Sequence, residues 1–507
     1  MIRRIYTTII SFTFAVLTFT SCSNWLELYP ADEIKEEYLF SSGDGYRTAL
    51  NGIYRKMSTF SLYGSNLTWG IIDAWGQAYY LGEAPDSGGG KAMKKIANFN
   101  FKNAELLPTT DAMWNAAWNV VANCNNLAQQ VAGADSLQFY GGERERRMIL
   151  SEAIGLRALM QFDLLRIYAP APVRMGYQDD KRTFIPYVDT YPSYVNNHQS
   201  VMYCLDKVIN DLKQAQTILE KVDKESKMDV SNRFSPAGTG EVMFLSFRGY
   251  RLNYYAVTAE LARAYLYAGK KAEAYAEAKK IIDVNKNQRY FRASSSRYDI
   301  EDGNMKMYND IIFALYSPTE LTEWDYEINH ASDDGSEYSG DYLCIHRNIA
   351  QQIYGDELET DWRATYQLES RYGAYYYRPL KYYAQPSKAK YAEVNNQTIP
   401  MIRMSEVYYI AAEAIFDSNP EEALGYLKEV KKGRGVSFNK TGIGREEFMN
   451  ILVNDARREF LGEGQILYLY KRLNIPIKTG DPYYGEDVLP TDEYAVLPLP
   501  DSESNIN

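Results

Sequence analysis

The chain has 507 residues, of which 46% are hydrophobic and 24% are charged. This length allows one large domain or two to three ordinary ones, and the composition is typical of a globular protein with a sizeable core. The formal net charge is −11. This acidic balance argues against nucleic acid or an anionic membrane surface as the main partner, because both need a basic footprint.

The first 21 residues have the pattern of a signal peptide, MIRRIYTTIISFTFAVLTFTS. Arg3 and Arg4 form a positive start, and the apolar run that follows is too short and too threonine-rich for a good transmembrane helix. The run ends in F-T-S-C, which resembles the lipobox of bacterial lipoproteins, with Phe19 where Leu is usual. We expect lipidation of Cys22, which would anchor residues 22–507 without a spanning helix. The alternative is ordinary cleavage, with Cys22 incidental.

Three further cysteines are Cys124, Cys204 and Cys344, and none forms a C-x-x-C motif. A zinc ribbon or a thioredoxin-type site is therefore disfavoured. With Cys22 lipidated, the remaining three allow at most one disulfide. The size and the low cysteine count exclude a disulfide-dense scaffold.

An aromatic and glycine-bearing stretch over residues 61–90 is our first candidate ligand site. A flat aromatic ring can cover the apolar face of a sugar, while a neighbouring carboxylate bonds its hydroxyls. The candidate residues are Trp69, Asp73, Trp75, Tyr79 and Tyr80. The alternative is that the two tryptophans belong to the core.

Amphipathic helices are expected over residues 111–131, 150–173 and 200–219, with a polar loop at 222–240. Residues 286–400 have weaker helical periodicity and read as a long insertion with few strands. One short strand is predicted at DIIFALYS, residues 310–317.

The insertion holds two aromatic stretches. Trp324 and Tyr326 lie in an acidic, Gly- and Ser-bearing segment and are our second pair of ligand candidates; the alternative is a rim without a ligand. The run SRYGAYYYRPLKYY, residues 370–383, suits a strand whose face binds either a protein or a ligand. Carboxylates in DIEDGN would attract Ca²⁺, but their spacing is not that of an EF-hand loop, and no cofactor is predicted.

Two stretches predict helical hairpins, one at residues 254–283 and one at 405–433. In each, two alanines stand twelve residues apart on the facing arms, Ala262 with Ala274 and Ala411 with Ala423. This is the spacing of a tetratricopeptide hairpin; the alternative is two ordinary antiparallel helix pairs. Asn419 as N-cap and Pro420 at the first helical position mark the start of the last arm.

Two segments in the same region resemble a known family. MIRMSEVYYIAAEA, residues 401–414, and NDARREFLGEGQILYLYKR, residues 454–472, resemble signatures of SusD/RagB-type outer-membrane nutrient-binding lipoproteins. NWLELYPADEI after Cys22, the helix at 150–173 and the C-terminal YAVLPLPDSESNIN resemble further landmarks of that family. Ile466 and Leu469 depart from the pattern by replacing an Arg and an Asp, which suggests a divergent branch.

The resemblance implies a mainly α fold: tetratricopeptide-like hairpins as a scaffold, with the loop-rich insertion forming part of one domain over residues 22–507. It implies a lipid-anchored protein on the cell surface at the outer membrane. Such a protein captures a nutrient, most often an oligosaccharide, and passes it to a SusC-like TonB-dependent β-barrel transporter. Capture of peptides, as by RagB-like members, is the alternative within binding.

Catalytic motifs are few. Only three histidines occur, none in H-E-x-x-H, and G-x-S-x-G is missing, so nucleophile–His catalysis has little support. The sequence does not exclude paired-carboxylate hydrolysis, because 66 acidic residues offer many pairs. A surface glycoside hydrolase is therefore the enzyme alternative to the binding protein that we expect, for which we predict no catalytic or metal-binding residues.

Overall fold

A computed structural model of the protein describes residues 36–82, 88–178, 181–223, 226, 228–235, 243–293, 296–317, 343–371, 373, 375–382 and 388–504. The predicted signal peptide, the lipidation site Cys22 and the ligand candidates Trp324 and Tyr326 lie outside these residues.

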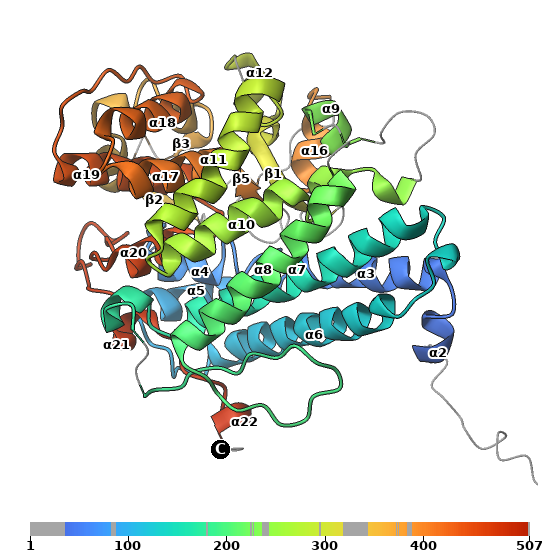
Figure 1. Ribbon diagram of the computed structural model, residues 1–507. Coiled ribbons are helices and arrows are strands. Elements are labelled where there is room, and N and C mark those ends of the chain that lie inside the picture. The colour runs from blue at the N-terminus through green and yellow to red at the C-terminus, as the bar shows by residue number, and fades with distance from the viewer. Residues whose placement is uncertain are drawn as a thin grey trace, which may run out of the picture.

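The fold is mainly helical, as predicted (Figure 1). The helices of the first half are α2 (Glu36–Leu39), α3 (Gly43–Met57), α4 (Ile71–Trp75), α5 (Gly88–Ala97), α6 (Leu107–Ala132), α7 (Gly142–Tyr168), α8 (Val201–Asp223), α9 (Val230–Arg233), α10 (Tyr254–Tyr267), α11 (Lys271–Gln288) and α12 (Tyr298–Glu301). Those of the second half are α14 (Arg347–Tyr354), α15 (Trp362–Thr365), α16 (Ala392–Gln397), α17 (Met404–Ile415), α18 (Pro420–Lys432), α19 (Arg445–Glu459), α20 (Ile466–Leu473), α21 (Asp492–Ala495) and α22 (Asp501–Ser504).

Helix α7 is the centre of the first half, and it packs between α6 and α8 (Figure 1). Every residue from Ser151 to Tyr168 is buried, so its charged side chains need partners. Arg157 donates to Asp211 of α8 at 2.8 Å and to Asn125 of α6 at 3.0 Å. Arg157 therefore links α7 to both neighbouring helices.

The two predicted hairpins form and stack on one another. Helices α10 and α11 make the first and α17 and α18 the second, and α11 packs directly against α17. Arg263 of α10 donates to both carboxylate oxygens of Glu406 on α17, at 2.6 and 2.7 Å. Asn419 caps α18 as predicted, accepting from the Glu422 amide at 3.3 Å. The long insertion thus separates, in sequence, two units that meet in space.

Five strands accompany the helices: β1 (Ile311–Tyr316), β2 (Ile345–His346), β3 (Leu368–Arg371), β4 (Tyr376–Pro379) and β5 (Thr398–Arg403). β1 is the strand predicted at 310–317, and it pairs antiparallel with β5, which leads directly into α17. The run at 370–383 was expected as one strand, but it contributes to two. Gly373 has a φ of +66° and turns the chain between β3 and β4. β2 completes a sheet of order β2-β4-β3.

One large hydrophobic core takes residues from helices of both halves and from the strands. Cys124, Cys204 and Cys344 are buried and free, so these three make no disulfide with one another. Among the described helices, none is both long and apolar enough to cross a membrane.

Candidate functional site

Three of the predicted ligand residues are buried in the core. Trp69 is 1% exposed and Trp75 is not exposed, and each indole N–H donates to a backbone carbonyl, that of Gly64 at 2.9 Å and that of Tyr494 at 2.7 Å. Tyr79 is 3% exposed. An exposed stacking surface of Trp69 and Trp75 is therefore a wrong expectation, because neither ring can be reached from solvent in this structure.

Asp73 is also fully buried, and it ties two distant segments together. Its carboxylate accepts the amide N–H of Gly462 at 2.6 Å and that of Gly464 at 3.1 Å. Burial raises the pKa of Asp73 to about 8, although the two N–H bonds act in the opposite direction. This geometry holds the turn after α19 against α4, so in this structure Asp73 bonds the backbone and does not face solvent.

Tyr80 differs from its neighbours, because it is partly exposed and belongs to an aromatic cluster. Its ring stacks on that of Tyr376 in β4, with centroids 5.7 Å apart and planes 4° from parallel. Its backbone N–H donates to the Cys344 carbonyl at 2.7 Å, which fixes the segment beside β2. We call this cluster the tyrosine platform; its members are Tyr80, His346, Tyr375, Tyr376, Tyr483 and Tyr484.

His346 lies beneath the exposed rings of the platform and is itself only 2% exposed. Its Nδ1 accepts the Asn348 amide N–H at 3.1 Å, and its Nε2 lies 3.0 Å from the Tyr483 hydroxyl. An Nδ1 that accepts leaves the proton of the neutral ring on Nε2, which then donates to Tyr483. Burial and the neighbouring Arg347 lower the pKa of His346, which favours this neutral form.

A tight loop after α20 carries the outer edge of the platform. The Asp481 carboxylate accepts the amide N–H of Tyr483 at 2.8 Å and that of Tyr484 at 3.3 Å, a typical Asx turn. A Cβ on Gly480 would lie 2.2 Å from the Tyr79 carbonyl oxygen, so only glycine lets the loop approach this closely.

The exposed rings suit stacking on a ligand. Tyr375, Tyr483 and Tyr484 are 47%, 52% and 92% exposed. Arg347 lies 4.5 Å above the Tyr375 ring and supplies planar donors at the edge. Flat apolar faces beside hydroxyl and guanidinium groups match a sugar, which has C–H faces and hydroxyl edges.

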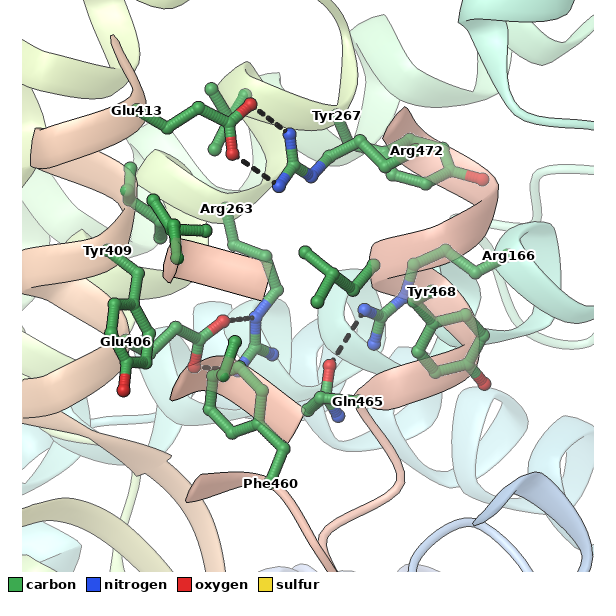
Figure 2. A pocket seen from close by; sticks show the side chains of 15 residues that line it. Arg166, Arg263, Tyr267, Glu406, Tyr409, Glu413, Phe460, Gln465, Tyr468 and Arg472 are labelled. Carbon is green, nitrogen blue, oxygen red and sulfur yellow. Dashed lines mark hydrogen bonds and ion pairs between the residues drawn. The ribbon is translucent and has the colours of Figure 1, made fainter. Parts of the chain in front are cut away.

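A small cavity of about 60 Å³ lies between α7, α10, α17, α19 and α20. Figure 2 shows two pairs of charged side chains in its lining, Arg472 with Glu413 and Arg263 with Glu406. Arg166, also in the lining, donates to the Gln465 side chain at 3.0 Å. Ligand pockets usually measure roughly 300–1,000 Å³, whereas this space suits a few waters. The cavity therefore belongs to the scaffold.

The residues that resemble the family signatures are buried beside this cavity, in a network of ion pairs. Glu459 of α19 is its centre: it accepts from Arg363 and from Arg434 at 2.9 Å, and from the Ser405 hydroxyl at 2.9 Å. We call this network the signature cluster; its members are Asp310, Asp361, Arg363, Lys381, Arg403, Ser405, Tyr409, Lys431, Arg434, Asp455, Arg458, Glu459 and Glu463. All its charges face other charges, so it offers no open site.

No cluster of three or more His, Cys, Asp or Glu side chains in the described part of the chain is placed to hold a metal ion. The three carboxylates of residues 299–304 are thus not gathered around a common point.

Comparison with known proteins agrees with this fold. Residues 248–494 match the SusD family. The chain is 22% identical to SusD-like protein P2 of Formosa agariphila, over 97% of this chain and 96% of that protein. A SusD superfamily protein from Bacteroides thetaiotaomicron has a crystal structure with a TM-score of 0.68 at 22% identity, covering 92% of this chain and 98% of that one. A SusD-like carbohydrate binding protein from Bacteroides vulgatus gives 0.66 at 18% identity, covering 92% and 96%.

The chain thus resembles SusD/RagB-type proteins in sequence over residues 248–494, and it shares the fold of solved SusD superfamily proteins over 92% of its length. The match to the SusD family favours a binding protein over the glycoside hydrolase alternative.

Sequence reasoning found one member of the platform, Tyr80, and flagged the run that carries Tyr375 and Tyr376. It missed His346 and the pair Tyr483 and Tyr484. The available signal was DPYYG at residues 481–485, a turn sequence with two adjacent tyrosines. This turn joins the platform only because its loop lies against β2 and Tyr80 in the folded protein. The spacing of these segments in the sequence does not predict that contact.

Proposed function

We propose that the protein is a cell-surface glycan-binding lipoprotein that captures an oligosaccharide on the tyrosine platform. The observation that carries this proposal is the platform itself: partly or largely exposed tyrosine rings from three distant segments, held in place by the buried His346. A recognition surface of preformed, rigid aromatic rings loses little entropy on binding. Stacking alone gives modest affinity, which suits a ligand that must be released.

The relatives support this class of ligand. Similar structures include the SusD-like carbohydrate binding protein of Bacteroides vulgatus and a surface glycan-binding protein A of Bacteroides fluxus. We extend their ligand class to this chain because its exposed rings have the matching chemistry.

The anchor and the partner follow from the family assignment and from the first 22 residues. We propose that Cys22 is lipidated, that residues 22–507 form one domain at the outer membrane, and that a SusC-like TonB-dependent barrel receives the ligand. Replacing Cys22 by Ala tests the anchor. The variant should be released from the membrane fraction and should not incorporate labelled palmitate, whereas an unchanged membrane fraction would contradict lipidation.

The other predicted ligand residues fall into two groups. We propose Trp324 and Tyr326 as further ligand residues, because their acidic, aromatic segment leads in the sequence to Leu343 and to β2, which carries His346 of the platform. For Trp69, Asp73, Trp75 and Tyr79, any effect on binding would be indirect, since they lie beneath the surface in this structure.

Calorimetric titration of residues 23–507 against a glycan panel and a peptide panel tests the proposal. We expect a neutral oligosaccharide to bind without turnover, and Tyr484→Ala to weaken that binding roughly 3- to 10-fold through loss of one stacking contact. Tyr194→Ala is the matched control, because Tyr194 is 90% exposed and lies outside the platform. Binding of peptides alone would assign the RagB-like alternative. Glycan binding that both variants leave intact would exclude this edge of the platform.

A further inference from the structure

A second hollow, far larger than the cavity of Figure 2, lies between α3, residues 234–235 and 243–251, and the ends of β1 and α16. We call it the α3 groove. Its volume is about 1,110 Å³, at the upper end of the range found for ligand sites. Its lining contains no member of the tyrosine platform. The groove is therefore a separate site, and its assignment does not rest on the function proposed above.

One wall of the groove is a polar stripe on α3. Arg47, Asn51, Arg55 and Ser58 are spaced by four, four and three residues, which places them on one face of the helix. The sequence thus presents donors along about three turns, from Arg47 in α3 to its C-cap Ser58, toward the same space.

Another part of the lining is aromatic. Tyr250 packs edge-to-face on Phe234 at 4.9 Å and on Tyr316 at 5.3 Å between ring centroids. The Tyr250 hydroxyl is held by Thr398 at 2.9 Å, so this ring is fixed. Tyr316 is 47% exposed and offers a ring to the groove. Such a wall can cover the C–H face of a sugar.

Two of the three arginines in the lining already have acidic partners. Arg47 donates to Glu145 at 2.5 and 2.7 Å, and Arg251 lies 3.8 Å from Glu152. Their guanidinium groups flank the ring of Phe244, at 5.1 and 4.0 Å from its centroid. These contacts stiffen the floor of the groove without leaving a free charge.

Arg55 is different. It is exposed, it lines the groove, and its guanidinium group makes no ion pair or hydrogen bond with any residue that the structure describes; its backbone carbonyl accepts from the Ser58 hydroxyl. The lining holds three arginines against one carboxylate, Glu393, in a chain whose net charge is −11. The groove thus holds a cation without an acidic side-chain partner, Arg55, and a ring suited to a sugar, Tyr316. This combination favours a ligand that carries both a pyranose ring and a negative charge.

We propose that the α3 groove binds an acidic oligosaccharide with carboxylate-bearing sugar units, with a carboxylate on Arg55 and a sugar face on Tyr316. Charge complementarity sets this class apart from the neutral glycan expected at the platform. The groove would then give the protein a second point of attachment on a charged polysaccharide.

Titration with galacturonate and mannuronate hexamers, each at low and high salt, tests the proposal; the neutral galactose hexamer and a hexaglutamate peptide are the comparison ligands. We expect one acidic sugar to bind, with affinity falling as salt rises. Arg55→Gln should weaken that binding at least about tenfold, as expected for loss of a charge-assisted bond. Tyr316→Ala should weaken it as well.

Lys56→Gln is the matched control, because Lys56 is the next cation on α3 and does not line the groove. It should leave binding within about twofold, the scale of a single surface charge. The proposal is overturned if neither acidic hexamer binds, if the two variants weaken binding equally, or if only hexaglutamate binds. Loss of acidic-sugar binding in Tyr484→Ala rather than Arg55→Gln would move the ligand to the platform, a result that leaves the proposed function intact.

Discussion

The signature cluster and the tyrosine platform are both assembled from segments that lie far apart in the sequence. The side chains of the cluster are buried and paired with one another, whereas the outer rings of the platform are exposed. In the cluster, Glu459 is 3% exposed and faces Arg363, Arg403 and Arg434. In the platform, Tyr484 is 92% exposed, and its ring contacts only the Tyr483 ring among the contacts described. Substitutions in the signature cluster should therefore destabilise the fold, and the cluster is closed to ligands. The tyrosine platform is open to ligands and contributes little to stability. The family motifs therefore report the scaffold, and ligand recognition lies elsewhere.

The largest effect should come from the centre of the cluster. Replacing Glu459 by Gln leaves guanidinium groups buried without a compensating charge, which costs about 3–5 kcal/mol of unfolding free energy. Urea unfolding monitored by circular dichroism measures it. Glu421→Gln on the exposed side of α18 is the control and should change stability by less than about 0.5 kcal/mol. Equal small effects would mean that the network is not a structural element.

The second-largest loss of stability should come from Trp75, and it tests whether this tryptophan belongs to the core or to a ligand site. Trp75→Phe removes the N–H that serves the Tyr494 carbonyl and leaves a void, with an expected loss of about 2–4 kcal/mol. Trp118→Phe is the matched control, because the Trp118 indole N–H is buried and has no described hydrogen-bond partner. That substitution should be nearly neutral. A Trp75→Phe variant with normal stability but impaired glycan binding would instead support Trp75 as a ligand-binding residue, as expected from the sequence.

Asp73 gives a pH dependence of known sign. Its folded-state pKa is raised to about 8 from an ordinary 3.8, chiefly by burial, so its stabilising contribution is full below pH 3.8 and is lost as pH rises through about 8. The stability difference between the wild type and Asp73→Asn should therefore shrink between pH 4 and pH 8, measured by unfolding at fixed temperature. Trp118→Phe, which alters no ionisable group, should show no such trend, and a constant difference for Asp73→Asn would contradict the raised pKa.

The cluster should respond to pH in the opposite sense. Burial alone would raise the pKa of Asp455, but Arg363, Lys431 and Arg458 hold it well below its usual range. A carboxylate with a lowered folded-state pKa stabilises the protein above its ordinary pKa, and this stability is lost as pH falls through the folded value. We therefore expect unfolding free energy to drop below about pH 4, in a titration followed by tryptophan fluorescence.

The smallest effect on stability belongs to the platform. Tyr484→Ala and Tyr194→Ala should each change the unfolding free energy by less than about 0.5 kcal/mol, because both rings are exposed. Only the first should weaken glycan binding. A large loss of stability in Tyr484→Ala would show that the loop after α20 is part of the scaffold.

The sequence was sufficient for the scaffold, because local signals agreed with one another. Asn419, Pro420 and the alanine spacing of the hairpins depend on helix geometry alone, and the structure places them as predicted. The strand at 310–317 was likewise readable from its β-branched and aromatic run.

The site was only partly readable, because burial is a property of the whole fold. Trp69 and Tyr80 stand eleven residues apart in one aromatic stretch, yet the first is core and the second is surface. What separates them is the turn at Gly462 and Gly464 held by Asp73, and the docking of Tyr80 on β2 and β4. These contacts join segments hundreds of residues apart, so no local pattern encodes them.

Hydrogen–deuterium exchange with and without the neutral glycan that titrates tests the central claim most directly. We predict slower exchange in peptides spanning residues 343–347, 375–379 and 479–485, which carry the platform, and unchanged exchange in the helices of the signature cluster. Protection confined to those helices, or to residues 61–75 without the platform, would contradict the division of the molecule into a closed scaffold and an open tyrosine face.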